Sequence, residues 1–134
     1  MNEVLLSTEE GKITEGLSSN FFAIRDGKLY TAEQDILFGT VRGVVIEVCK
    51  EEKIPVVLES PHTTDLKACE AAFITSTSRL VLPIDEIAVC RHPTQGDTSA
   101  LIKYSVLFPE NILLQKIVDG VKAKIIKRST AIIE

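Results

Sequence analysis

The sequence predicts a mixed α/β domain, because β-type segments fill its first third and helical and β-type segments alternate after it. Two observations carry this prediction. The dipeptide Asp26-Gly27, typical of a two-residue hairpin turn, separates two β-type segments. From Gly39 onward, apolar residues recur at the spacing of a helix. The 134 residues fit one domain, which we take to span residues 1–134.

The first third of the chain is typical of antiparallel β structure. We expect a short strand at 3–7, closed by a polar turn at 8–11. A second strand is expected at 20–25, and 28–31 is its return strand across the Asp26-Gly27 turn. These segments predict a hairpin that is preceded by one further strand.

A helix is predicted from Gly39-Thr40 to near Lys53. Its apolar residues occupy positions i, i+3, i+4, i+7 and i+8, which form one stripe. The stripe consists of Val41, Val44, Val45, Val48 and Cys49. This pattern indicates a helix that packs one face against the core.

The segment after this helix returns to β structure and then to a short helix. Residues 54–59 are expected to form an apolar strand, with Pro55 among its first residues or at an edge. A short helix is expected at 64–69, capped by the side chain of Thr63 or Thr64.

The last part of the chain carries weaker signals. Two strands are expected at 71–75 and 80–82, around a polar turn at 76–79. A loop is expected at 90–97, and Pro109 is expected at the first position of a final helix. The apolar stripe of that helix is Leu114, Ile117, Val118, Val121 and Ile125.

Composition places the chain among ordinary globular proteins, with 45% hydrophobic and 25% charged residues. Fifteen basic and nineteen acidic residues give a net charge of -4, which argues against nucleic acid or an anionic membrane as a partner. We find neither a signal sequence nor an apolar run of membrane-spanning length. A cytoplasmic protein is therefore expected.

The cysteines and histidines are not arranged as a metal site. Cys49, Cys69 and Cys90 are widely separated, which favours buried, reduced thiols. His62 and His92 stand singly beside prolines in loops, with no second ligand at metal-binding spacing. We therefore expect no metal.

Three short segments offer groups that could bind a ligand. Glu15 is a carboxylate in a turn after a strand, and such residues are most often simply solvated. Gly39-Thr40-Val41 starts a helix, where backbone N–H groups favour an anion, although every helix has such an end. Ser76-Thr77-Ser78 offers three hydroxyls, more commonly the mark of a hydrogen-bonded turn. None of the three is specific alone.

Their order and spacing resemble a known family. Thr14–Phe22, Ile36–Arg42 and Phe73–Ser78 follow one another as in the C-terminal, cofactor-binding domain of the fold-type IV (class IV) pyridoxal-phosphate-dependent aminotransferases, of the branched-chain and D-amino acid aminotransferase type. The resemblance covers the chain from about Glu3 to Ile87. It implies the C-terminal domain of the D-amino acid aminotransferase-like fold, with a mixed, partly barrel-like sheet and flanking helices, and pyridoxal 5'-phosphate as cofactor.

The resemblance implies roles for the first two segments. Glu15 would pair with the pyridine nitrogen and hold it protonated, so that the ring can accept electron density from the substrate. Asn20 would brace the Glu15 loop. Gly39, Thr40 and Val41 would form the phosphate cradle, in which the backbone N–H groups of Thr40 and Val41 contact the phosphate.

The third segment and Arg42 also have implied roles. Arg42 closes the Gly-x-x-Arg turn of the cofactor site, where an arginine more often pairs with a structural carboxylate than with the ligand. Ser76 stands where many relatives have glycine, and Thr77 would bind the phosphate through its hydroxyl and N–H. The N–H groups of Thr77 and Ser78 would face the α-carboxylate of the substrate. Arg79 could clamp an acidic substrate, or be an exposed turn arginine.

The family uses an amino acid and a 2-oxo acid as substrates and works as a homodimer, so both are implied partners. It also uses a Schiff-base lysine a few dozen residues before the glutamate, and here Met1 stands fourteen residues before Glu15. No lysine of this chain occupies that place, and Lys12 is interpreted as a surface residue. The sequence therefore offers a cofactor site without a catalytic residue.

Three interpretations follow from the resemblance. The chain is the C-terminal part of a class IV aminotransferase, inactive by itself; this is the interpretation we favour. Alternatively, it is a natural truncated relative that binds pyridoxal phosphate without a covalent bond, or acts as an interaction module. The third interpretation is a fragment of an aminodeoxychorismate lyase-like enzyme, because that reaction uses the same half-site.

Overall fold

The computed structural model describes residues 4–8, 10–16, 19–33, 39–90 and 102–133. Several predictions fall wholly or partly outside this range. These are the start of the strand at 3–7, residues 17–18 and 36–38 of the family motifs, and most of the loop at 90–97 with His92.

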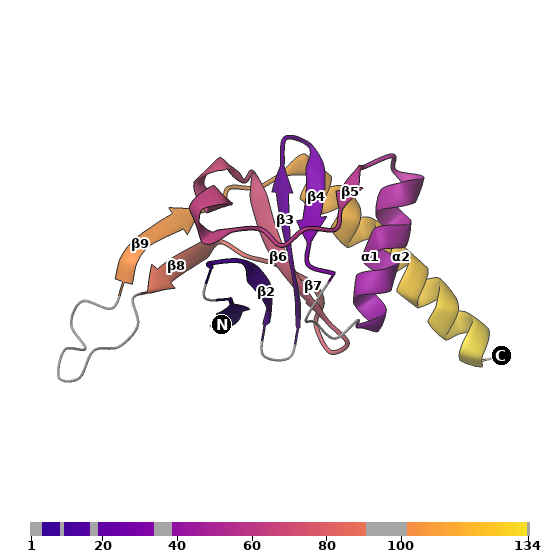
Figure 1. Ribbon diagram of the computed structural model, residues 1–134. Helices are drawn as coiled ribbons and strands as arrows, with labels where there is room; N and C mark the ends of the chain where they lie inside the picture. Colours follow the sequence, from indigo (N-terminus) through magenta and orange to yellow (C-terminus); the bar gives the residue numbers. More distant parts are fainter. Residues whose placement is uncertain (1–3, 9, 17–18, 34–38, 91–101, 134) are drawn as a thin grey trace.

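The larger of two sheets carries most of the fold (Figure 1). Its strands are β1 (Leu5–Ser7), β2 (Ile13–Gly16), β3 (Asn20–Arg25), β4 (Lys28–Thr31), β5 (Val56–Val57), β6 (Ala71–Ser76) and β7 (Leu80–Pro83). Strands β4 and β5 run parallel, and the other neighbours are antiparallel. Strands β8 (Glu86–Cys90) and β9 (Ile102–Leu107) form a separate antiparallel pair. The mixed α/β fold class is confirmed.

The sheet forks at β3, which lies in its centre. One edge of β3 pairs with β6 from Asn20 to Ile24. The other edge pairs with β4 from Phe22 to Arg25 and with β2 at Asn20. Because β3 is covered on both faces, its residues from 20 to 24 are all buried. The partly barrel-like curvature of this sheet stays a prediction.

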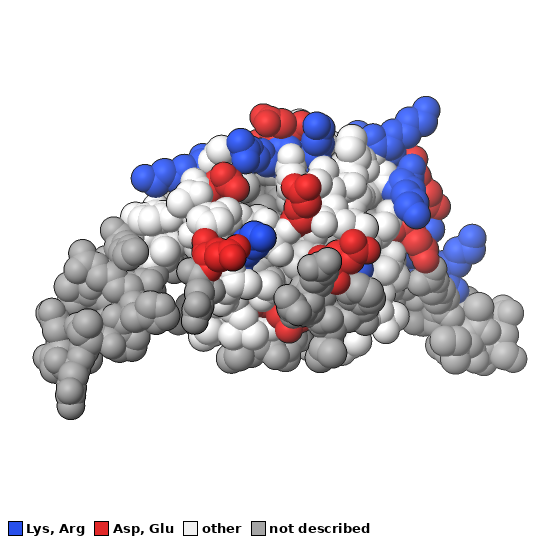
Figure 2. All heavy atoms as spheres, viewed as in Figure 1, with Lys and Arg blue, Asp and Glu red and all other residues white. Residues whose placement is uncertain are grey.

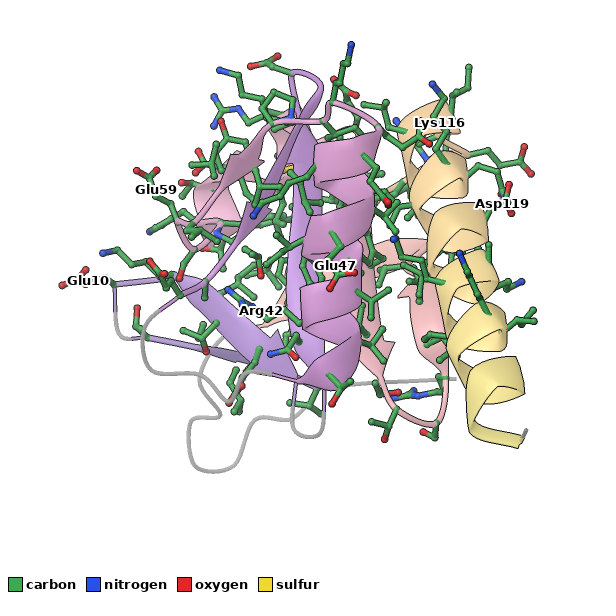
Figure 3. The ribbon with its side chains drawn as sticks, turned by 90° about the vertical axis from the view of Figure 1, so that its right-hand side faces the viewer. Glu10, Arg42, Glu47, Glu59, Lys116 and Asp119 are labelled. Atoms are coloured by element: carbon green, nitrogen blue, oxygen red, sulfur yellow. The ribbon has the colours of Figure 1, made fainter. Side chains whose placement is uncertain are left out.

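Helices α1 (Thr40–Glu51) and α2 (Ile112–Ile133) lie side by side and cover one face of the sheet (Figures 1 and 3). Lys124 of α2 reaches across to α1, where its Nζ lies 2.8 Å from a carboxylate oxygen of Glu51. Between the helices and the sheet lies the first core cluster. Its largest members are Phe22, Phe73, Ile24, Leu29 and Ile117, and the predicted α1 stripe belongs to it.

The opposite face of the sheet holds a second core cluster, formed with the 3₁₀ helix η1 (Thr63–Ala68) and the β8–β9 pair. Phe21 and Ile74 contribute from the sheet, Leu66 from η1, and Ile87 and Val106 from β8 and β9. Alternate residues of β3 and β6 therefore serve two different cores, as expected of a buried strand pair with period two.

The structure corrects the predicted ends of four elements. His62 caps η1, because its Nδ1 accepts the Thr64 N–H at 3.1 Å, so the expected threonine cap is wrong. Helix α2 begins at Ile112 instead of Pro109, since Asn111 Oδ1 accepts the Leu114 N–H at 3.0 Å. The strand expected at 54–59 is limited to the two residues of β5, and the helix expected to end near Lys53 ends at Glu51.

Three strands were not predicted as separate elements. Strand β2 is short and follows the turn after β1, and β8 and β9 pair across a long sequence separation, Glu86 with Leu107. The pairing of β8 with β9 joins residues that are distant in the chain, which residue periodicity does not reveal.

Candidate functional site

Three polar side chains form a row across the sheet at the end where β2 and β3 join. The strand register places Glu15 of β2 opposite Asn20 of β3, and Asn20 opposite Thr75 of β6. Residues directly opposite one another point to the same face of a sheet. The row therefore faces the layer of α1 and α2, because Phe22 and Phe73, two residues along each strand, belong to that core.

A shift in register turns Glu15 toward this face. Leu6 pairs with Glu15 and Ser7 pairs with Ile13, so Thr14 has no partner in the β1–β2 ladder. Ile13 packs into the core on the opposite face. In a regular strand Glu15 would point the same way as Ile13, and the bulge reverses this alternation. The carboxylate of Glu15, half-buried, is thereby brought beside Asn20.

Asn20 connects this row to the start of α1. Its side chain is only 5% exposed, and its Oδ1 accepts the N–H of Gly39 at 3.2 Å. A Cβ atom on Gly39 would lie 2.6 Å from that oxygen, closer than real side chains approach. Glycine is therefore required here by close contact, since its φ of -74° is open to any residue. The hydrogen bond thus joins β3 to the start of α1, and the expected brace of the Glu15 loop stays a prediction.

The start of α1 lies at the surface, and the side chain of Val41 in its first turn enters the core. Gly39 and Thr40 are exposed, and Val41 is buried in the first core cluster. The first N–H groups of a helix have no acceptor in the helix and carry its positive partial charge. The buried Val41 side chain leaves these backbone donors in place.

Arg42, in the first turn of α1, is buried (Figure 3). Its Nη2 donates to the carbonyl oxygen of Ala32 at 3.0 Å. Burial lowers the pKa of Arg42 below its ordinary value, and the nearby Glu33 carboxylate acts in the opposite direction. An arginine remains charged under such conditions. Arg42 thus ties α1 to the segment that follows β4 and adds positive charge below the helix start.

The turn between β6 and β7 lies at the same end of the sheet as the start of α1 (Figure 1). Ser76 closes this turn, because its Oγ accepts the N–H of Arg79 at 3.2 Å. Thr77 and Ser78 are exposed, and Arg79 is half-buried. Leu80 has a φ of +55°, a conformation that costs energy in a non-glycine residue, and it packs against the first core cluster. The side chain at Ser76, where many relatives have glycine, therefore has a structural use.

The site fits an elongated anionic ligand such as pyridoxal phosphate. It combines a carboxylate that suits a ring nitrogen with an exposed helix start that suits a phosphate. In addition, the hydroxyl of Thr75 is buried and has no hydrogen-bond partner in the part of the chain that the structure describes. An orphaned buried hydroxyl beside Asn20 is typical of a ligand site.

Away from the row, the described part of the molecule has a hollow but no cluster of side chains that could hold a metal ion. A hollow of about 630 Å³ borders Ala71, at the end of β6 remote from Thr75, and is lined also by Pro83, Asp85, Phe108 and residues at the start of α2. On the face shown in Figure 2, basic and acidic side chains are interspersed. Among the described residues, no group of histidine, cysteine or acidic side chains could hold a metal ion. In the same part of the chain, every helix is too short or too polar to cross a membrane.

The described lysine and cysteine side chains near these strands have ordinary surface or core roles. Lys12 is exposed and pairs with Glu10 at 3.6 Å, in line with a surface residue. Burial raises the pKa of both Cys49 and Cys69 to about 11. Because the thiolate is the reactive form, both are expected to be poor nucleophiles.

The mixed α/β fold matches that of class IV aminotransferase structures. The chain matches the family described as "Amino-transferase class IV" over residues 1–87, and it belongs to this family.

Relatives with named activities are similar to this chain over part of their length. The "Putative branched-chain-amino-acid aminotransferase" of Methanocaldococcus jannaschii is 38% identical over 89 residues, which is 65% of this chain and 31% of that protein. The D-alanine aminotransferase of Staphylococcus epidermidis is 40% identical over 77 residues, 56% of this chain and 27% of that protein. The crystal structure of the branched-chain aminotransferase from Thermoproteus uzoniensis has a TM-score of 0.71 and 28% identity, covering 90% of this chain and 36% of that one. The chain therefore spans about a third of the length of these proteins.

Proposed function

We propose that this chain, as a single domain over residues 1–134, is the cofactor-binding part of a pyridoxal-phosphate-dependent class IV aminotransferase. The observation that carries the proposal is the Asn20 hydrogen bond to Gly39, which joins β3, the neighbour of the strand that carries Glu15, to the exposed start of α1. These two features suit the two ends of one ligand. Pyridoxal phosphate has a basic ring nitrogen at one end and a phosphate near the other.

Each residue has a physical task in this proposal. The Glu15 carboxylate holds a proton on the pyridine nitrogen by charge and hydrogen bonding. The N–H groups of Thr40 and Val41 donate to the phosphate, whose charge the helix start also stabilises. Thr77 would donate its hydroxyl to the same phosphate. When bound, the protonated ring withdraws electron density from the α carbon of the substrate.

The substrate side of the proposal rests on the β6–β7 turn. The exposed N–H groups of Thr77 and Ser78 are suited to the α-carboxylate of an amino acid or a 2-oxo acid. The printed names of the relatives include both a branched-chain and a D-alanine aminotransferase, so the side chain of the substrate stays open. A homodimer in the cytoplasm, the role of Arg79 at the turn and the lyase alternative remain predictions of the resemblance.

Binding of pyridoxamine 5'-phosphate tests the proposal. This form lacks the aldehyde, so it does not react with surface lysines. Calorimetric titration of the wild-type chain is expected to show one site, and Glu15→Gln is expected to weaken it about tenfold, since a charge-assisted hydrogen bond is lost. Glu59→Gln, which changes an exposed carboxylate away from the row, is the matched control and should bind like wild type. Absence of saturable binding by the wild-type chain would contradict the proposal.

A further inference from the structure

Asn20, in the row of polar side chains, makes a hydrogen bond to another element of the fold. The Oδ1 atom of Asn20, on β3, accepts the backbone N–H of Gly39, nineteen residues later and directly before α1. The bond is 3.2 Å long and part-buried. Asn20 is 5% exposed, and the missing side chain of Gly39 leaves room for its Oδ1 atom. The side chain of Asn20 is thus held against Gly39.

This bond fixes the distance between two parts of the candidate site. On β2, Glu15 is the direct cross-strand neighbour of Asn20, so the position of its carboxylate is set by the sheet. The start of α1 is set relative to the same asparagine by the bond to Gly39. Since Gly39 uses its N–H in this way, the next N–H groups, of Thr40 and Val41, are the ones directed at a ligand.

We propose that Asn20 is a positioning residue that sets the spacing between the ring-nitrogen subsite at Glu15 and the phosphate subsite at the start of α1. This inference rests on the proposed function. In this role Asn20 does not contact the cofactor. Its side chain holds the two subsites at the separation that one rigid ligand requires. A ligand that fills both subsites gains affinity from that preset spacing, and a ligand that fills one subsite does not.

Three ligands separate this task from a merely structural one. Pyridoxamine 5'-phosphate fills both subsites, pyridoxamine fills the Glu15 subsite, and inorganic phosphate fills the helix subsite. Titrations are followed by the amide signals of Thr40 and Val41 and of the β2 strand in nitrogen–proton correlation spectra, which report weak binding. In Asn20→Ala, affinity for pyridoxamine 5'-phosphate is expected to fall about tenfold or more, and affinity for either smaller ligand by less than about twofold.

Asn111→Ala is the matched control. Asn111 Oδ1 accepts the Leu114 N–H at 3.0 Å at the start of α2, so this variant loses the same type of bond at a different helix. It should leave the affinities for all three ligands unchanged, even where it lowers the unfolding temperature. If Asn111→Ala lowers the affinity for the large ligand as Asn20→Ala does, the effect is one of stability and the inference is wrong.

Asn20→Asp keeps the test decisive if Asn20→Ala does not fold. A carboxylate at position 20 still accepts the Gly39 N–H, so the spacing is kept, but its charge repels an anion at the helix start. Affinity for phosphate should then fall, whereas affinity for pyridoxamine, which is a cation, should not fall. A lower affinity for pyridoxamine in this variant would overturn the inference. Equal losses for all three ligands in Asn20→Ala, or no loss for the large ligand, would overturn the inference. If the wild-type chain binds none of the three, the proposed function itself is overturned.

Discussion

Replacing Gly39 by alanine should destabilise the protein, although the same replacement at most helix positions is favourable. The backbone of Gly39, with φ of -74° and ψ of 154°, suits alanine, so backbone strain does not enter. The new Cβ would lie 2.6 Å from Asn20 Oδ1, and Asn20 has little room to move because it is 5% exposed. Either the hydrogen bond breaks or the start of α1 shifts.

The magnitude follows from the groups involved. Loss of the Asn20–Gly39 bond costs about 1 kcal/mol. Relief of the overlap between the new Cβ and Asn20 Oδ1 costs about 1–3 kcal/mol more. The lower chain entropy of alanine in the unfolded state returns about 0.5–1 kcal/mol. We therefore expect the free energy of unfolding to fall by about 2 kcal/mol. Urea unfolding followed by circular dichroism measures this change.

Gly43→Ala is the control for this prediction. Gly43 lies four residues further along, within α1, where an added Cβ would meet no atom within 4 Å. The variant should therefore gain about 0.5–1 kcal/mol from helix propensity. In the double variant Asn20→Ala, Gly39→Ala, the second change should cost far less than in the wild-type background, because the clash is gone. The reasoning is refuted if Gly39→Ala is as stable as the wild-type chain.

Further predictions concern the core and the row. Gly120→Ala should destabilise by about 1 kcal/mol despite its better helix propensity, because the Cβ would lie 2.6 Å from Val48 Cγ1. In a Val48→Ala background, which is less stable itself, the same change should cost little in a thermal unfolding series. Thr75→Val should stabilise the ligand-free protein by about 1 kcal/mol in urea unfolding, since it removes a buried hydroxyl that has no partner among the described residues. Thr31→Val is the comparison, and it should destabilise the protein by a similar amount, because Thr31 Oγ1 donates to the Phe21 carbonyl oxygen at 2.8 Å. Burial raises the pKa of Cys49 to about 11 from an ordinary 9.0. Between these pH values the thiol ionises in the unfolded chain and stays neutral in the folded one, so the free energy of unfolding falls as pH rises. Unfolding at pH 8 and pH 10.5 should show a smaller loss in Cys49→Val; an equal loss in both proteins contradicts this assignment.

Elements that depend on residues close together in the sequence could be predicted from the sequence. The Asp26-Gly27 turn has φ of 52° and 73°, the positive values for which this dipeptide is favoured, and it joins β3 to β4 as expected. The stripe from Val41 to Cys49 faces the core along one side of α1. The end of α1 and the start of α2 were less well predicted, because a cap depends on which side chain reaches a backbone N–H.

The order of three motifs in the sequence was enough to identify the family and to suggest Glu15, the start of α1 and the Ser76–Ser78 turn as one site. The tertiary structure decided how these parts relate. A one-residue bulge at Thr14 turns Glu15 to the helix-covered face, and its existence depends on pairing with β1. The role of Asn20 depends on a contact with Gly39 that no local pattern encodes. Side-chain periodicity determines which face a residue takes within one element, but only packing between elements determines which residues from distant parts of the chain touch.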